Sequence, residues 1–184
     1  MSEQINDTFD YKNTIFCISA VQFPYEFFSI QQLGLNPESE STDCWRGYVA
    51  KFSLHQGKLI LKDIDTNNSN GKALPVAING VVPDVKKPPM LNEDYRNWRN
   101  WHYRDINLIL PYSGSVLITD SFLNERIVQV GFQSPLSYRK VIELRFDKGH
   151  LVNENDESGT AELIRNYEYE NEKLPWWGLA IDWY

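Results

Sequence analysis

Aromatic and basic side chains alternate over residues 95–104, where Trp98, Arg99 and Trp101 are close in sequence. Aromatic faces stack on bases, sugars or other rings, and arginine adds a positive charge that is attracted to such faces. The segment therefore has the composition of a surface that contacts a ligand or a protein partner. We take Trp98, Arg99 and Trp101 as candidate contact residues.

The same segment has a second interpretation, which is packing. Tyr95, Trp98 and either Trp101 or His102 recur at the spacing of one face of a helix. Residues 93–104 are thus predicted to form a helix whose aromatic face packs on the rest of the protein. Packing is the more common origin of such a stripe, and the sequence leaves both interpretations open.

A fourth candidate is Arg46, which lies within Trp45-Arg46-Gly47-Tyr48. An arginine flanked by aromatic residues can bind an anion or a carbonyl group, and a glycine lets a ligand approach the backbone. The alternative is a bulge at Gly47, with both rings in the core and Arg46 paired to a carboxylate. We weigh the structural alternative more heavily and keep Arg46 among the candidate contact residues.

The last eleven residues are apolar and aromatic, and they include Trp176, Trp177, Trp183 and Tyr184. Such rings suit a sugar-stacking platform or a protein-binding patch, because Trp and Tyr are enriched in interface hot spots. The alternative is a docked terminal strand that fills the edge of the core. Since adjacent residues of a strand point to opposite faces, at least one of Trp176 and Trp177 is expected to be buried.

Residue patterns of known catalytic and metal sites are missing from the sequence. His55, His102 and His150 have no partners at metal-ligand spacing, so no metal or other cofactor is expected. There is no G-x-S-x-G nucleophile motif and no glycine-rich phosphate loop. We therefore predict no catalytic residues, and the sequence favours a binding protein over an enzyme.

Two hairpins must position these residues, one over residues 52–59 and one over 144–151. In both, apolar and polar residues alternate with the period of a half-buried strand. A short polar turn ends in Gly57 or Gly149, and glycine supplies the positive φ of a three-residue hairpin loop with a bulge. The alternation therefore predicts a β-rich protein.

Further segments have the patterns of strands, helices and loops. The additional strands are expected at residues 14–21, 74–78 and 126–132, with a third hairpin over 106–118. Pro24 is expected to begin a loop or a helical turn. A helix is predicted over residues 160–172, and the acidic residues 153–157 are expected to form a solvated loop, with binding of a basic partner as the weaker alternative.

These elements predict a mainly β fold with minor α content. Eight or nine strands joined mostly as hairpins favour an antiparallel meander, forming a partly closed barrel or a two-layer sandwich with one or two peripheral helices. The 184 residues suit a single domain over residues 1–184. Residues 1–12 are expected to be a flexible arm, and residues 158–184 a helix plus a docked aromatic tail.

Composition excludes several classes of partner. The formal net charge is −7 and no basic stripe is visible, so nucleic acid is not an expected partner. No apolar run reaches the roughly 20 residues that cross a bilayer, and no signal peptide is visible. With Cys17 and Cys44 expected as reduced thiols, these features predict a soluble cytoplasmic protein.

One string of residues resembles a known motif. Cys44-Trp45-Arg46-Gly47-Tyr48, followed by an alternating strand, looks like a motif of an uncharacterised family of small bacterial β-rich proteins. Residues 131–138, residues 142–146 and Gly149 are similar to the second half of the same group. The resemblance implies one bacterial β-rich domain. No activity is assigned to that family, so no catalytic residue is implied.

Two functions are carried forward. The first is a non-enzymatic binding protein that recognises a protein partner, suggested by the acidic charge, the aromatic surplus and the missing catalytic motifs. The alternative is a small-molecule-binding β-barrel, either a carrier or an enzyme, with an aromatic-lined pocket. A filled core with aromatic residues on the surface favours the first function, and an enclosed aromatic cavity favours the second. A purely structural subunit of a homo-oligomer is a third hypothesis.

Overall fold

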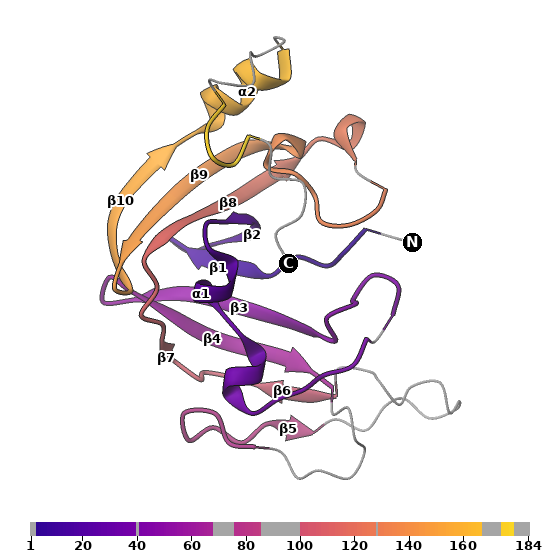
Figure 1. Cartoon of the computed structure of the whole chain (residues 1–184), viewed down its shortest axis with the longest axis vertical. Coiled ribbons are helices and arrows are strands. Elements are labelled where there is room, and N and C mark those ends of the chain that lie inside the picture. Colours follow the sequence, from indigo (N-terminus) through magenta and orange to yellow (C-terminus); the bar gives the residue numbers. More distant parts are fainter. Residues whose placement is uncertain are drawn as a thin grey trace.

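The computed structural model describes residues 3–39, 41–67, 76–85, 100–127, 129–166 and 174–178. Within these ranges ten strands form one curved sheet (Figure 1). The strands are β1 (Thr8–Tyr11), β2 (Thr14–Val21), β3 (Tyr48–His55), β4 (Lys58–Thr66), β5 (Asp84–Val85), β6 (Trp101–Tyr103), β7 (Leu108–Ile109), β8 (Gly114–Phe122), β9 (Tyr138–Asp147) and β10 (His150–Asp156).

Helices are few and short in the same ranges. The α-helices are α1 (Pro24–Phe27) and α2 (Ser158–Asn166), and 3-10 helices span Ile30–Leu33, Asn124–Arg126 and Pro135–Ser137. None of these described helices is long and apolar enough to cross a membrane. The predicted mainly β class with peripheral helices is confirmed, as are the helical turn at Pro24 and a helix in the region of α2.

Seven of the strands form a ring in the order β10-β9-β8-β2-β1-β3-β4, and β4 pairs back onto β10. The ring closes where the two hairpins predicted from the sequence meet. His150 pairs with Lys58, and the Leu59 amide donates to the Gly149 carbonyl at 2.7 Å. This ring is consistent with either a partial barrel or a sandwich.

One pairing departs from the predicted antiparallel meander, because β1 and β3 run parallel. All other neighbouring strands are antiparallel in the part of the chain that the structure describes. Parallel neighbours need a long connection, and β2, α1 and residues 28–47 together provide it between β1 and β3. Local alternation carries no information about such a connection.

The turns of the two hairpins are shorter than predicted. Gln56 and Gly57 have φ values of 51° and 75°, and Lys148 and Gly149 have values of 47° and 83°. Positive φ at both central residues defines a two-residue type I′ turn, whose twist matches that of the flanking strands. The hairpin positions are confirmed, and the three-residue loop with a bulge was wrong.

The prediction of a flexible arm over residues 1–12 was wrong for residues 8–11. They form β1, which pairs with β2 on one edge and with β3 on the other. Phe9 is fully buried among the core side chains. One partner, β2, follows directly after the turn at Lys12 and Asn13, whereas the other, β3, begins only at Tyr48. The polar composition of the N-terminal residues concealed the burial of β1.

Packed aromatic rings fill the inside of the ring. Phe27 lies 4.7 Å from Phe52 and 5.1 Å from Tyr112, measured between ring centroids. Phe146 lies 6.2 Å from Tyr112 and 6.5 Å from Phe9. These distances are those of favourable aromatic pairs, and each fully buried ring contributes roughly 1.5–3 kcal/mol through burial.

The outer face of β8 and β9 carries a second, smaller core. Leu117 and Val141 pack there against Ala161 of α2 and against Trp177. Trp177 is fully buried, which confirms that at least one of the adjacent tryptophans is buried. Residues 176–178 form a turn rather than the predicted terminal strand, and residues 179–184 lie outside the described residues.

Three other predicted elements differ in the structure. Residues 101–103 form β6 instead of the end of a helix, and residues 93–99 lie outside the described residues. The third hairpin does not form, because β7 pairs with β4 while β8 pairs with β2 and β9. In the segment predicted as a strand over 126–132, Arg126 ends a 3-10 helix and Gly131 makes an isolated bridge to Glu3. Distant partners decided the positions of β6, β7 and β8.

Candidate functional site

Arg46 lies in the interior, where its guanidinium binds a buried carboxylate. Its Nη1 donates to Asp7 Oδ2 at 2.8 Å, and the Asp7 side chain is fully buried. The guanidinium also lies 4.7 Å from the ring centroid of Tyr48 and 5.0 Å from that of Phe132. Asp7 Oδ1 accepts a further hydrogen bond of 2.7 Å from the amide of Ala50. This arrangement is the paired arginine of the structural interpretation.

Gly47 is required by the protein's own backbone. Its φ is +69°, and a Cβ at this position would lie 1.9 Å from the Glu38 carbonyl oxygen. Asn67 holds Glu38 in place, accepting from its amide at 2.9 Å and donating to its carbonyl at 2.6 Å. Burial, followed by the charge of Asp7, raises the pKa of the Tyr48 hydroxyl to about 12. The Arg46 corner, meaning Arg46, Gly47 and Asp7, is therefore built as a packing unit.

The other candidate contact residues do not join Arg46 in a described surface. Trp101 is buried in β6 and belongs to the main core. Trp98 and Arg99 lie outside the described residues. The four residues chosen from the sequence are thus not brought together by the part of the chain that the structure describes.

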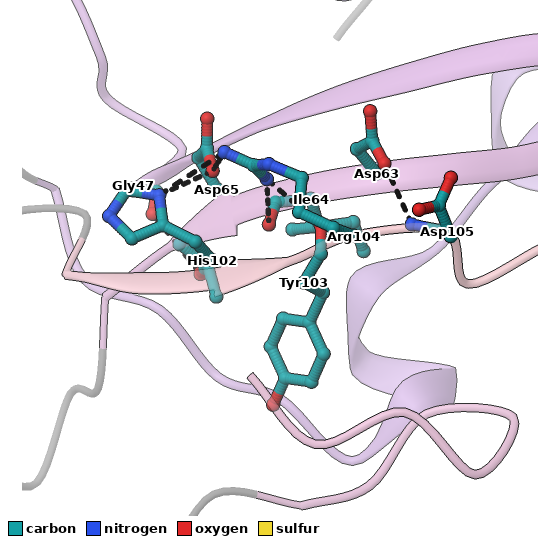
Figure 2. A network of polar contacts seen from close by, with 9 residues as sticks. Gly47, Asp63, Ile64, Asp65, His102, Tyr103, Arg104 and Asp105 are labelled. Carbon is teal, nitrogen blue, oxygen red and sulfur yellow. Dashed lines mark hydrogen bonds and ion pairs between the residues drawn. The ribbon is translucent and has the colours of Figure 1, made fainter. Parts of the chain in front are cut away.

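A polar network lies beside β6, where Asp65 contacts a histidine and an arginine (Figure 2). Asp65 Oδ1 lies 2.6 Å from His102 Nδ1 and 2.5 Å from an Arg104 nitrogen. Asp65 and His102 face each other across β4 and β6. Close by, the Asp105 amide donates to Asp63 Oδ1 at 2.9 Å.

An aspartate that binds one imidazole nitrogen orients the other nitrogen for general-base chemistry. Figure 2 shows the second nitrogen of His102 pointing away from Asp65. Among the described residues, the hydrogen-bonding partners of His102 are Asp65 and Arg104, and neither carries a hydroxyl or thiol that His102 could deprotonate. The network connects β6 to β4. Among the described residues it contains the Asp–His pair of a general base but no residue for that base to activate.

The outer face of β8, β9 and β10 contains a hollow of about 900 Å³. We call it the β10 hollow. It is lined by Gln22, Phe23, Ser113, Gly114, Ser115, Glu143, Arg145, Phe146, Asp147, Val152, Asn153, Asn155 and Trp176. Its floor is polar because Glu143 and Arg145 of β9 point outward, while Leu144 between them belongs to the inner core. Its rim includes Phe23 and Val152, each more than half exposed.

Hydrogen bonds organise the floor of the β10 hollow. Trp176 Nε1 donates to Glu143 Oε1 at 2.8 Å, which connects the C-terminal turn to β9. Asn155 Nδ2 approaches the other oxygen of Glu143 at 3.5 Å, and Asn153 Nδ2 donates to Asn155 Oδ1 at 3.2 Å. The floor therefore presents an ordered row of carboxylate and amide groups.

The rim residue Phe23 has an unusual backbone conformation. Its φ and ψ of 56° and 62° lie in the left-handed region, which is rare for a bulky residue. The single Tyr112 hydroxyl hydrogen is shared between the carbonyls of Gln22 and Ser115, so the corner before Phe23 is fixed from the core. Strain of this kind persists only where the surroundings hold it, and it is enriched at functional sites.

Sequence reasoning did not find the β10 hollow. Residues 153–157 were predicted to be a solvated loop, but residues 153–156 belong to β10. Alternation around Leu144 and Phe146 did indicate that Glu143 and Arg145 share the opposite face. What the pattern could not indicate is that Phe23 and Trp176, from distant parts of the chain, would surround that face.

No family model, no curated protein and no solved structure matches the chain. The resemblance of the Cys44–Tyr48 string to a bacterial family accordingly stays a prediction. Any function must be argued from the geometry of the Arg46 corner, the Asp65 network and the β10 hollow.

Proposed function

We propose that this chain is a non-enzymatic binding protein that takes a segment of a protein partner into the β10 hollow. The observation that carries the proposal is that the hollow lies outside the sheet while the core inside the ring is filled. The ring is filled by Phe9, Phe27, Phe52 and Tyr112, each at most 2% exposed, whereas the hollow lies on the outside of the sheet. An exterior binding site is the arrangement that favours a partner over an enclosed small molecule.

The composition of the β10 hollow supports the same proposal. Interfaces combine aromatic and apolar anchors with polar groups that fix orientation. Phe23, Val152 and Trp176 supply the former, and Arg145 and Asn153 belong to the latter. The strained backbone of Phe23 places a large ring in solvent at the rim, where a partner would cover it.

A cytoplasmic location and a bacterial origin are part of the proposal. Cys17 and Cys44 are not in a disulfide, and the Cys44 thiol donates to the Tyr48 carbonyl. Burial raises the pKa of the Cys17 thiol, which lowers its reactivity toward oxidants. Free thiols are usual in a reducing compartment, which supports the assignment.

In the experiment, the full chain is immobilised and incubated with an extract of the cells that produce it, and the proteins that it retains are quantified. Val152→Glu places a charge on the rim of the hollow, and Val82→Glu makes the same change at an exposed valine that does not line it. We expect one protein to be retained by the wild type and by Val82→Glu. Retention by Val152→Glu should fall roughly tenfold, corresponding to about 1.4 kcal/mol.

Circular dichroism of both variants is the control for folding. If Val152→Glu retains the same proteins in the same amounts as the wild type, the β10 hollow is not the binding surface. A further check places a photo-crosslinking amino acid at position 153 or at position 82. The partner should be crosslinked from position 153 alone.

A further inference from the structure

The floor of the β10 hollow contains one uncommitted charge, which is that of Arg145. Arg145 is exposed, and no residue that the structure describes forms a hydrogen bond or an ion pair with its guanidinium. It pairs in register with Ser115 of β8 on one side and with Asn153 of β10 on the other. Arg145 therefore lies in the middle of the floor.

The carboxylates of the hollow already have partners. Glu143 accepts from Trp176 at 2.8 Å and lies 3.5 Å from Asn155 Nδ2. Asp147 Oδ1 lies 3.5 Å from the hydroxyl of Ser113. Among the charged groups of the floor, the one without a partner in the described residues is thus the Arg145 guanidinium. Its planar donors match a carboxylate in a bidentate geometry.

The shape of the floor suits an extended chain. Asn153 and Asn155 lie two residues apart on β10 and point to the same face as Arg145. Their spacing along the strand equals the two-residue repeat of an extended peptide, at roughly 6.6 Å. Asn side chains both donate and accept, so they can bind successive peptide groups of such a segment.

We propose, as a refinement of the proposed function, that the β10 hollow binds an extended peptide segment bearing a carboxylate, and that Arg145 pairs with this carboxylate. Phe23 and Trp176 flank the neighbouring side chains of the segment, and Asn153 and Asn155 bind its backbone. Glu143 and Asp147 repel a carboxylate placed elsewhere in the hollow. The position of the acidic residue within the segment is therefore set by Arg145.

The test is selection of a randomised eight-residue peptide library with the full chain. Three proteins are compared, which are the wild type, Arg145→Gln and Arg139→Gln. Arg139 is a matched control because it is exposed on the same strand and does not line the hollow. We expect Asp or Glu at one position of the peptides selected by the wild type and by Arg139→Gln, and no such preference with Arg145→Gln.

One selected peptide is then synthesised with its acidic residue and with the corresponding amide. For the wild type the amide peptide should bind roughly tenfold more weakly. For Arg145→Gln the two peptides should bind equally. This result would show that the carboxylate strengthens binding through its interaction with Arg145.

Several results would overturn the inference. They are selection of neutral or basic peptides, no enrichment above the starting library, an unchanged acidic preference with Arg145→Gln, and selective binding to a glycan array in place of peptides. Loss of the natural partner on Val152→Glu, together with any of these results, would leave the proposed function standing. If Val152→Glu also fails to reduce capture, both proposals fall.

Discussion

Arg46 and Arg145 have the same side chain in opposite environments. Arg46 is largely buried, is paired with Asp7 and lies between two aromatic rings. Arg145 lies on the floor of an open hollow, where no described residue pairs with it. The N–H groups of a paired and buried arginine are already hydrogen-bonded, while those of an exposed arginine inside a hollow are accessible to a ligand. The difference teaches that a conspicuous sequence motif can be structural while a plain strand residue is available for binding.

The sharpest way to break this comparison is to remove the partner of Arg46. Asp7→Ala leaves a buried guanidinium without its carboxylate, and such a loss costs about 3–5 kcal/mol. Urea denaturation should show this decrease in the free energy of unfolding. Arg145→Gln should change it by less than about 0.5 kcal/mol, as is usual for an exposed site. Equal effects of the two substitutions would mean that the two environments are not different.

The next largest effect is expected at Gly47, also in the Arg46 corner. Gly47→Ala brings a Cβ against the Glu38 carbonyl and forces a positive φ on a residue that disfavours it. We expect a loss of at least about 2 kcal/mol, since a clash adds to the conformational cost. Gly57→Ala is the control, because Gly57 also has a positive φ of +75° but a Cβ added there meets no other atom within 4 Å. This substitution should lower the free energy of unfolding by about 1 kcal/mol. Thermal unfolding that ranks the two variants in the reverse order would contradict the packing role of Gly47.

A smaller effect is expected where the core supports the rim of the β10 hollow. Tyr112→Phe removes the hydroxyl whose hydrogen is shared between the Gln22 and Ser115 carbonyls. The expected loss of stability is about 1 kcal/mol, the net value of a hydrogen bond. Binding of the captured partner should weaken as well, because the corner before Phe23 loosens. Weaker binding without a change in stability would show that the hydroxyl acts only on the site.

The smallest effect concerns pH at the far end of β10. Hydrogen bonds from Ser158, and then Lys140, lower the pKa of Asp156 to about 2. Because the folded-state pKa lies below the unfolded value, the associated stability is present above about pH 4 and is lost as the pH falls toward 2. Its size should be below about 1 kcal/mol, since Asp156 is largely exposed. Asp156→Asn should flatten the stability profile between pH 4 and pH 2, and an unchanged slope would assign the acid sensitivity to other carboxylates.

Several parts of the fold could be predicted because their causes are local. The alternation around Phe52 and Leu144 placed two hairpins, and Pro24 marked a helical turn where a strand could not continue. The turn length was missed, since one glycine per turn does not reveal that Gln56 and Lys148 also adopt positive φ. The alternation predicts which face of a strand is buried, but it does not predict which other strand pairs with it.

The candidate site was mostly beyond prediction for the same reason. Arg46 attracted attention through its aromatic neighbours, yet its carboxylate comes from Asp7, almost forty residues earlier. Trp176 was considered a binding residue for its type, but its role depends on Glu143 on a central strand. Side chains that meet through strand pairing leave no trace in the spacing of either segment.

By itself, the sequence determined the β class, the two central hairpins and, around Phe52 and Leu144, the alternation of apolar and polar residues. These follow from period-two burial and from glycine in the turns, which act over a few residues. Only the tertiary structure decided that β1 enters the ring, that β10 returns to β4, and that Arg46 is enclosed while Arg145 is left open. Those outcomes depend on which distant strands pair, and that choice is made by the burial of the whole core.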